Sequence, residues 1–369
     1  MRRIDLHCYP GTQEWIDSQG PYVEALGKYW GKEWTGKSEE DVVADVKAAG
    51  MEAVLVAFDI EAVTGAPPCT NGYVAALRDR HPETFIGAWG AVDPFKGERA
   101  IEDAVTAVRE HGVLGFHFHP IMGHYAVDEP GLNPLFETIA GLGVPVMIDV
   151  GTTGMGAGLP GGLGARIEHA RPLSVDNLAA RFPSLTIIAA HPGWPWTDEM
   201  TAVALHKGNV FWELSGWAPK YFPPSLRTDI RGRLREKMMF GSDHPSMPYE
   251  RILREWDELG YDQSIMDLVF HANAERVLGL LRGLPRGRAA DRPGPAAVVR
   301  APDQGAREVP GRADRLRLGV AGRGTAWLRL PAGGTGRAGG QPPGHVHDAA
   351  AQRRAVPVGP RPAWRTRRR

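Results

Sequence analysis

Short apolar runs alternate with helical patterns over the first 281 residues of this chain. The apolar runs predict strands at 4–9, 53–58, 85–92, 112–119, 144–150, 185–191, 210–215 and 238–243. Amphipathic segments predict helices at about 38–50, 71–80, 98–111, 132–142, 174–182, 197–207, 225–237, 249–259 and 264–279. Ser38 and the acidic residues after it form a helix-capping pattern, and Gly50 ends that helix.

This alternation predicts the fold class. Strands that alternate with helices pair in parallel through right-handed crossovers. Eight such units in 281 residues match an α/β protein of the (β/α)8 TIM-barrel type, with an open doubly wound sheet as the alternative. We therefore expect one barrel domain over residues 1–281.

Residues 282–369 have a different composition. They contain 19 arginines and five acidic residues, whereas the whole chain has a formal net charge of zero. Arg, Pro, Gly and Ala dominate, and the scattered apolar residues offer too little burial to offset the entropy of ordering. We expect a C-terminal extension that is disordered or translated out of frame. A nucleic-acid-binding arm is less favoured, because Trp327 and Trp364 are its only aromatic residues.

The sequence carries no signal for export or membrane insertion. Its first residues include charged groups where a signal peptide needs an apolar run, and no apolar stretch approaches the length of a membrane span. Cys8 and Cys69 are too few for a disulfide framework or a cysteine-built zinc site. We expect a cytoplasmic protein that binds a small-molecule substrate.

Ionisable side chains stand at the ends of several predicted strands. In a parallel barrel the C-terminal strand ends gather at one rim, where catalytic residues lie. The eighth strand closes beside the first, so we expect His7 next to Asp243. Nitrogen and oxygen ligands that leave one position open suit a catalytic divalent cation. The candidate ligands are His7, Asp149, Asp243 and Asp5, and the candidate catalytic residues are His191 and Asp243.

Other side chains near these strand ends are candidates for contacting a substrate. The long glycine-rich segment from 151 to 171 predicts a flexible lid over the barrel mouth. Its glycine spacing matches a dinucleotide fingerprint by letter, but it contains Pro160 and does not open a helix, so we reject that function. His117 is as consistent with core packing as with a ligand role. The candidate lining residues are Tyr9, His119, Arg166, Arg171, Trp194 and Trp217.

Several short motifs follow one another along the chain. They are Ile-Asp-Leu-His at 4–7, Gly-Phe-His-Phe-His-Pro at 115–120, Ala-His-Pro-Gly-Trp at 190–194 and Gly-Ser-Asp-His-Pro at 241–245. Over residues 1–281 the chain resembles the amidohydrolase-related family that includes aminocarboxymuconate-semialdehyde decarboxylase. The resemblance implies a metal-dependent barrel enzyme that acts on small, often aromatic-derived carboxylates by hydrolysis or nonoxidative decarboxylation. Homodimers are common in this family.

Two positions depart from the pattern of that family. The second histidine of its usual His-x-His pair is Tyr9 here, and its usual histidine on the fifth strand is Asp149. One alignment takes Asp5-x-His7 as the ligand pair. It gives an oxygen-rich set of Asp5, His7, Asp149 and Asp243, which would suit Mn, Mg or Fe better than Zn. The alignment that places Tyr9 at the second histidine leaves an eroded site and an enzyme that works without a metal.

The function expected from these observations is hydrolysis of a small, aromatic-derived carboxylate, ester or thioester. Asp243 would accept a proton from an activated water, and His191 would polarise the substrate carbonyl. Two alternatives remain open. One is a nonoxidative decarboxylase, that is, a carboxy-lyase, and the other is a catalytically silent barrel that binds a ligand.

Overall fold

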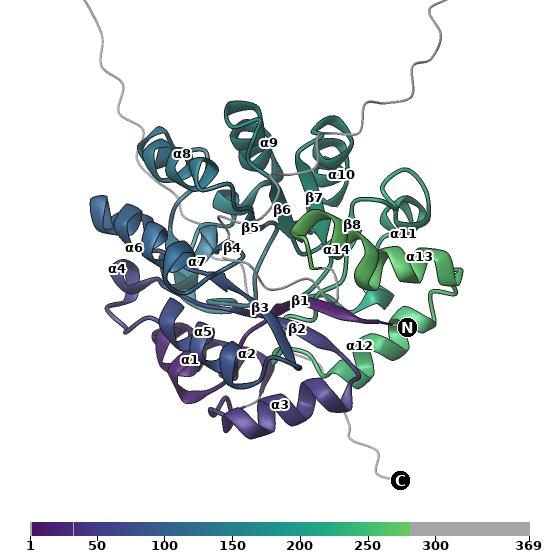
Figure 1. Ribbon diagram of the computed structural model, residues 1–369, viewed down its shortest axis with the longest axis horizontal. Coiled ribbons are helices and arrows are strands. Elements are labelled where there is room, and N and C mark those ends of the chain that lie inside the picture. Colours follow the sequence, from purple (N-terminus) through teal and green to yellow (C-terminus); the bar gives the residue numbers. More distant parts are fainter. Residues whose placement is uncertain (1, 32, 281–369) are drawn as a thin grey trace, which may run out of the picture. The chain divides into compact units, whose positions relative to one another are not determined.

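The computed structural model describes residues 2–31 and 33–280 (Figure 1), so the expectations for residues 282–369 lie outside the described part. The described residues form an eight-stranded parallel sheet in which each strand pairs with the next along the chain. This sequential order confirms the TIM barrel, and the doubly wound alternative is wrong. The strands are β1 (Ile4–Cys8), β2 (Glu52–Val56), β3 (Phe85–Gly90), β4 (Gly115–Phe118), β5 (Val146–Asp149), β6 (Ile187–Ala190), β7 (Val210–Glu213) and β8 (Met238–Met239).

The barrel closes through the segment that follows β8. β8 itself is two residues long, and the backbone beyond it runs alongside β1. Leu6 N donates to Phe240 O at 3.2 Å, and Asp243 N donates to the carbonyl of His7 at 2.9 Å. Tyr9 N donates to the carbonyl of the residue after Asp243, also at 2.9 Å. These bonds form a seam that places the first and last strand ends side by side.

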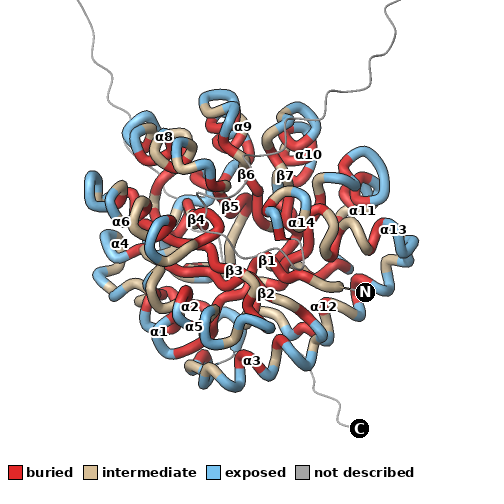
Figure 2. The backbone as a smooth tube through the Cα atoms, in the orientation of Figure 1, coloured by how far each residue is buried: buried red, intermediate tan, exposed pale blue. Residues whose placement is uncertain are grey.

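Amphipathic helices surround the strands, with buried faces turned inward and exposed faces outward (Figure 2). The helix predicted to begin at Ser38 does begin there, because Ser38 Oγ accepts the backbone N–H of Asp41 at 3.1 Å. The helices that follow the strands are α3 (Glu39–Ala48), α5 (Asn71–Arg80), α6 (Glu98–Arg109), α8 (Asn133–Gly141), α9 (Pro172–Arg181), α10 (Thr197–His206), α11 (Pro224–Arg231), α12 (Tyr249–Asp257), α13 (Gln263–Asp267) and α14 (Asn273–Leu278).

Two predicted helices differ from those observed. α11 ends at Arg231 instead of 237, because Gly232 adopts φ −116° and ψ −113° and leaves the helical conformation. The last predicted helix is interrupted between α13 and α14 by a π-helical turn, η6 (Leu268–Ala272). There the carbonyl of Val269 accepts the backbone N–H of Phe240 at 2.9 Å, which ties the turn to the end of β8.

Four short helices in the loops after the strands were not predicted. They are α1 (Gln13–Ser18) and α2 (Pro21–Trp30) after β1, α4 (Glu61–Thr64) after β2, and α7 (Pro120–Gly123) after β4. These helices lie at the C-terminal rim of the barrel, where they help to shape the entrance to the site.

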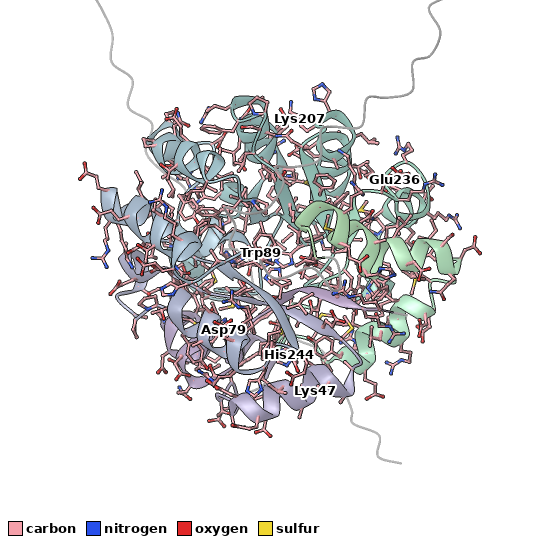
Figure 3. The ribbon with its side chains drawn as sticks, viewed as in Figure 1. Lys47, Asp79, Trp89, Lys207, Glu236 and His244 are labelled. Atoms are coloured by element: carbon pink, nitrogen blue, oxygen red, sulfur yellow. The ribbon has the colours of Figure 1, made fainter. Side chains whose placement is uncertain are left out.

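Large side chains fill the space between strands and helices. Trp89 on β3 lies near the middle of the view in Figure 3, whereas Lys47, Lys207 and Glu236 lie at its periphery. The buried Trp89 donates its Nε1–H to the carbonyl of Leu6 at 2.9 Å, so its polar atom is satisfied. No described helix combines the length and apolar character that crossing a membrane requires.

Candidate metal centre at the barrel rim

Three ionisable side chains meet at the C-terminal rim of the barrel. His7 lies on β1, Asp149 ends β5, and His191 follows β6. Each offers one nitrogen or oxygen atom, and these three atoms lie within 4.8 Å of one another. The rings of His7 and His191 stack with centroids 5.3 Å apart, and His191 Nε2 lies 3.4 Å from Asp149 Oδ1. The structure thus brings together three side chains that the strand ends singled out.

Asp243 lies in the seam, and its side chain is next to the cluster of His7, Asp149 and His191. Its Oδ1 lies 3.8 Å from His7 Nε2, so these two residues are neighbours. Asp243 and His191 both have left-handed backbone conformations, with φ of 61° and 72°. For a non-glycine residue this conformation costs about 1–2 kcal/mol, and such strain gathers at functional sites.

Asp149 is enclosed by three histidines. His117 Nε2 lies 2.9 Å from Asp149 Oδ1, and His119 Nε2 lies 3.4 Å from Oδ2. Burial alone would raise the pKa of Asp149, but His117, His191 and His119 together hold it well below its ordinary value. Asp149 is therefore a carboxylate at neutral pH. His117, which the sequence did not distinguish from a core residue, contacts the site directly.

Burial and charge set the protonation of the other groups. Burial lowers the pKa of His7 to about 4, although Asp243 and Asp149 oppose this shift. Burial also disfavours charge on His191, but Asp149 and two further carboxylates outweigh it and raise its pKa to about 10. Burial raises the pKa of Asp243 to about 6. At pH 7 the site therefore holds a neutral His7, a protonated His191 and an ionised Asp243.

Glu213 and Ser215 belong to the same site, although neither is among the residues predicted from the sequence. Glu213 ends β7, is fully buried, and has Oε2 3.3 Å from His7 Nδ1. Ser215 Oγ donates to Glu213 Oε2 at 2.8 Å and lies 3.0 Å from His191 Nδ1. Burial raises the pKa of Glu213 to about 7. A carboxylate at the end of an apolar run is the same signal that pointed to Asp149, so Glu213 could have been found.

The donor atoms fit a divalent cation. His7 Nε2 and Asp149 Oδ2 are buried, and neither has a hydrogen-bond partner among the described residues. Buried polar atoms in this state are costly unless a ligand or water completes them. Together with His191 Nε2 they offer two nitrogen donors and one oxygen donor. This set suits Zn, Mn or Fe, whereas Mg prefers oxygen ligands alone.

Asp5 lies outside this group of three, and both of its carboxylate oxygens accept hydrogen bonds within the protein. Its Oδ1 accepts the backbone N–H groups of His7 at 3.0 Å and Ser242 at 2.9 Å. Its Oδ2 accepts the hydroxyls of Ser242 at 2.5 Å and Tyr249 at 2.6 Å. The pairing of β1 with β2 is irregular between Asp5 and Cys8. Asp5 instead ties β1 to the seam and to α12.

The aromatic candidates lie at different depths. Tyr9 is buried, with its ring centroid 5.1 Å from that of His7 and 5.9 Å from that of His117. Burial holds the pKa of Tyr9 well above its usual value, so it is a neutral phenol beside the cluster and not an anionic ligand. Trp194 is 53% exposed and packs against Trp217 with ring centroids 5.8 Å apart.

Three positively charged side chains in the loops at the rim are paired with carboxylates. Arg166 forms an ion pair with Glu168, and Arg171 pairs with Glu199 at 2.9 Å. Lys96, in the loop after β3, contacts two carboxylates of the loop after β2 at 2.8 Å each. The structure therefore gives no support to Arg166 or Arg171 as a free anion-binding group.

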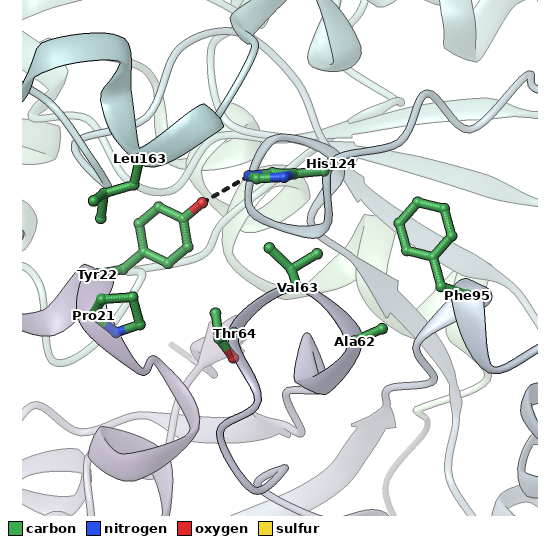
Figure 4. A pocket seen from close by; sticks show the side chains of 8 residues that line it. All are labelled: Pro21, Tyr22, Ala62, Val63, Thr64, Phe95, His124 and Leu163. Carbon is green, nitrogen blue, oxygen red and sulfur yellow. Dashed lines mark hydrogen bonds between the residues drawn. The ribbon is translucent and has the colours of Figure 1, made fainter.

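A pocket of about 470 Å³ opens among the loops that follow β1 to β5 (Figure 4). Its lining includes Tyr22 on α2, Val63 on α4, Phe95 after β3, His124 after α7 and Leu163 after β5. Tyr22 Oη and His124 Nε2 lie 2.9 Å apart, and burial lowers the pKa of His124. The lining side chains are thus uncharged at neutral pH. The pocket lies at the same rim as the cluster of His7, and two of its walls come from α2 and α4, loop helices that the sequence did not predict.

Comparisons with known proteins agree with this architecture. No curated protein matches the sequence. An uncharacterised TIM-barrel protein from Bordetella bronchiseptica has a TM-score of 0.59 and 19% identity, covering 76% of this chain and 99% of that one. A 5-carboxyvanillate decarboxylase from Novosphingobium aromaticivorans, complexed with manganese and 4-hydroxy-3-methoxy-5-nitrobenzoic acid, has a TM-score of 0.57 and 18% identity, covering 74% and 95%. A probable 2-pyrone-4,6-dicarboxylic acid hydrolase from Acinetobacter baumannii, with citric acid bound, has a TM-score of 0.53 and 14% identity, covering 76% and 100%.

At these identities the solved structures establish the shared fold. The sequence itself matches the family profile described as amidohydrolase over residues 16–280, which includes Asp149, His191 and Asp243 but begins after β1 and His7. The chain belongs to the amidohydrolase family.

Proposed function

We propose that this protein is a metal-dependent hydrolase of small, aromatic-derived esters, thioesters or related carboxylates. The observation that carries the proposal is the cluster of His7, Asp149 and His191, with the carboxylate of Asp243 beside it. Family membership and the manganese in one structural relative support a cation at this position.

Three side chains of the cluster would hold a cation, and Asp243 would transfer a proton. A bound divalent cation supplies Lewis-acid polarisation of a substrate oxygen and lowers the pKa of water. Neutral His7 keeps the Nε2 lone pair that binding requires, and Asp149 supplies a carboxylate oxygen. In this assignment His191 holds the cation and does not polarise the carbonyl directly. Asp243, with a pKa of about 6, accepts a proton from the attacking water and returns it to the leaving group.

The pocket at the rim shares no lining residue with the cluster, and we assign it to an uncharged ring or apolar group at the distal end of the substrate. Tyr22, Phe95 and Leu163 offer apolar surface, and the hydroxyl of Tyr22 is held by His124. A second anionic group would meet arginines and a lysine that are already paired with carboxylates. The substrate is therefore expected to differ from the dicarboxylic acid in the name of the Acinetobacter baumannii relative.

Nonoxidative decarboxylation is the second candidate. The raised pKa of Asp243, about 6, makes its minor protonated form a source of a proton for a ring carbon as carbon dioxide leaves. The Novosphingobium aromaticivorans relative is named as a decarboxylase of an aromatic acid.

Elemental analysis of the purified full-length protein tests the metal centre. We expect one equivalent of Zn, Mn or Fe per chain, which His7→Ala and Asp149→Asn should each remove. Glu255→Gln is the matched control, because Glu255 is also a buried carboxylate but pairs with Arg251 on α12, away from the cluster. A wild-type protein that stays free of metal after growth and dialysis with each cation would refute the proposal.

A substrate panel separates the reactions. Aryl esters, aryl thioesters and hydroxybenzoates are incubated with the loaded enzyme, and acid release and carbon dioxide release are measured in parallel. Hydrolysis should dominate, and Asp243→Asn should lower it by about 100-fold or more, as for loss of a general base. Carbon dioxide release from a hydroxybenzoate without ester hydrolysis would establish the decarboxylase instead. Metal binding without turnover of any compound would favour a silent ligand-binding barrel.

A further inference from the structure

We infer that Glu213 and Ser215 are positioning residues that fix His7 and His191 with hydrogen on Nδ1, so that both Nε2 atoms face the cation site. The part concerning the cation rests on the proposed function. The part concerning the two imidazoles does not, because it follows from hydrogen bonds within the protein.

The hydroxyl of Ser215 has one hydrogen to give and two lone pairs to share. It donates that hydrogen to Glu213 Oε2 at 2.8 Å. It also lies 3.0 Å from His191 Nδ1 and 3.3 Å from His7 Nδ1. Since the hydrogen is already used, the hydroxyl can only accept from both rings. Both Nδ1 atoms must therefore carry a hydrogen.

Independent acceptors support the same assignment for each ring. His191 Nδ1 lies 3.1 Å from the backbone carbonyl of Ser215, which can only accept. His7 Nδ1 lies 3.3 Å from Glu213 Oε2, which already accepts from the serine. Each imidazole thus meets two acceptors on its Nδ1 side, and this fixes the ring orientation as well as the tautomer of the neutral ring.

The opposite edges of the rings face the candidate ligands. His7 Nε2 is buried without a hydrogen-bond partner in the described part of the chain and lies 3.8 Å from Asp243 Oδ1. His191 Nε2 lies 3.4 Å from Asp149 Oδ1. A histidine that donates through one nitrogen to a carboxylate or carbonyl and binds metal through the other is a recurring arrangement in metal sites. Glu213 and Ser215 would make this arrangement for two ligands at once.

Two glycines leave the space that the pair needs. A Cβ atom at Gly241 would lie 2.2 Å from Glu213 Oε1 and 3.0 Å from His7 Cβ. A Cβ atom at Gly216 would lie 2.6 Å from His191 Nδ1, and Gly216 has a φ of 72°. The backbone is therefore shaped around the carboxylate and the imidazole, which supports a built arrangement rather than an incidental contact.

The first test measures the tautomer of His7 in chelator-treated full-length protein. Histidine labelled with nitrogen-15 reports which ring nitrogen carries hydrogen, and His7→Gln assigns the signal. We expect hydrogen on Nδ1 of His7 in the wild type and in Ser215→Ala, where Glu213 Oε2 still accepts, and a mixture of tautomers when Ser215→Ala is combined with Glu213→Leu. Hydrogen on Nε2 in the wild type would overturn the inference. This readout needs no metal, so it stands even if the proposed function fails.

The second test measures the affinity for cobalt from its visible absorption during competition with a chelator. Ser215→Ala should weaken binding by about 10–100-fold, as is typical when an outer hydrogen-bond partner of a ligand is lost. Ser174→Ala is the matched control, since Ser174 is a mostly buried serine on α9 that bonds a backbone carbonyl outside the cluster. Glu213→Gln retains a carbonyl oxygen, so binding should remain closer to the wild type than in Glu213→Leu. Wild-type affinity in a folded Ser215→Ala or Glu213→Leu protein would overturn the positioning role.

Discussion

Cation binding should strengthen about tenfold from pH 8 to pH 9, because binding must displace a proton from His191. The pKa of His191 is raised to about 10 by Asp149 and its neighbouring carboxylates, against the opposing effect of burial. Its deprotonated fraction at pH 8 is then about one in a hundred, and it grows tenfold by pH 9. Each pH unit therefore adds about 1.4 kcal/mol to the binding free energy.

His7 and the three carboxylates of the cluster do not contribute to this slope. His7, with a pKa of about 4, is already neutral, and Asp149 is already ionised. Asp243 and Glu213, with pKa values of about 6 and 7, lose their protons below pH 8. The window from pH 8 to pH 9 thus isolates His191.

Two measurements on the chelator-treated full-length protein check this prediction. Competition with a chelator of known pH dependence gives the Kd for cobalt at each pH. A pH indicator in weakly buffered solution should record about one proton released per cation at pH 8. His191→Gln should bind more weakly, show little pH dependence and release almost no proton. A tightly bound cation with a pH-independent Kd and no proton release in the wild type would show that His191 is not a protonated ligand.

Four further outcomes follow from other parts of the structure. Asp5→Asn should lower the free energy of unfolding, measured in urea, by about 1–3 kcal/mol, because hydrogen bonds to a buried carboxylate are weakened. Its metal content, measured by elemental analysis, should stay unchanged, and metal loss in a folded variant would make Asp5 a ligand. Gly216→Ala should lower kcat/KM, since its Cβ would lie 2.6 Å from His191 Nδ1, and an unchanged kcat/KM would contradict the close approach. Arg171→Ala should leave KM within about twofold because this surface arginine pairs with Glu199, whereas a large rise in KM would identify it as a substrate contact. In a pH profile, kcat/KM should rise with pH through a pKa at or below 6, because Asp243 must be ionised to act as a base and a nearby cation favours the ionised form. A kcat/KM that is flat from pH 4 to 8 would argue against this role of Asp243.

Strand ends could be predicted well from the sequence for a physical reason. Strands of a parallel barrel are buried on both faces, so each reads as an uninterrupted apolar run. An ionisable residue such as Asp149 or His191 at the end of a run then stands out. Glu213 carries the same signal, since it precedes Leu214 near the end of its run just as Asp149 precedes Val150.

Features that depend on irregular backbone could not be predicted in this way. The hydrogen bonds of Asp5 to Ser242 and Tyr249 join segments far apart in the chain, and no pattern near Asp5 marks them. The pocket depends on how short loop helices such as α2 and α4 pack together, and helices of this kind carry little periodicity of their own. His117 required the position of Asp149 from a neighbouring strand before its role could be assigned.

The backbone seam between β1 and the segment after β8 closes the barrel without using the side chains of the site. His7 and Asp243 contribute to it through main-chain atoms, so exchanging their side chains leaves the closing hydrogen bonds in place. Variants at these two positions should therefore remain closed barrels with altered ligand sets. Such a chain offers a scaffold in which the donor atoms at the rim can be exchanged one at a time, and a new cation preference can be selected without rebuilding the fold.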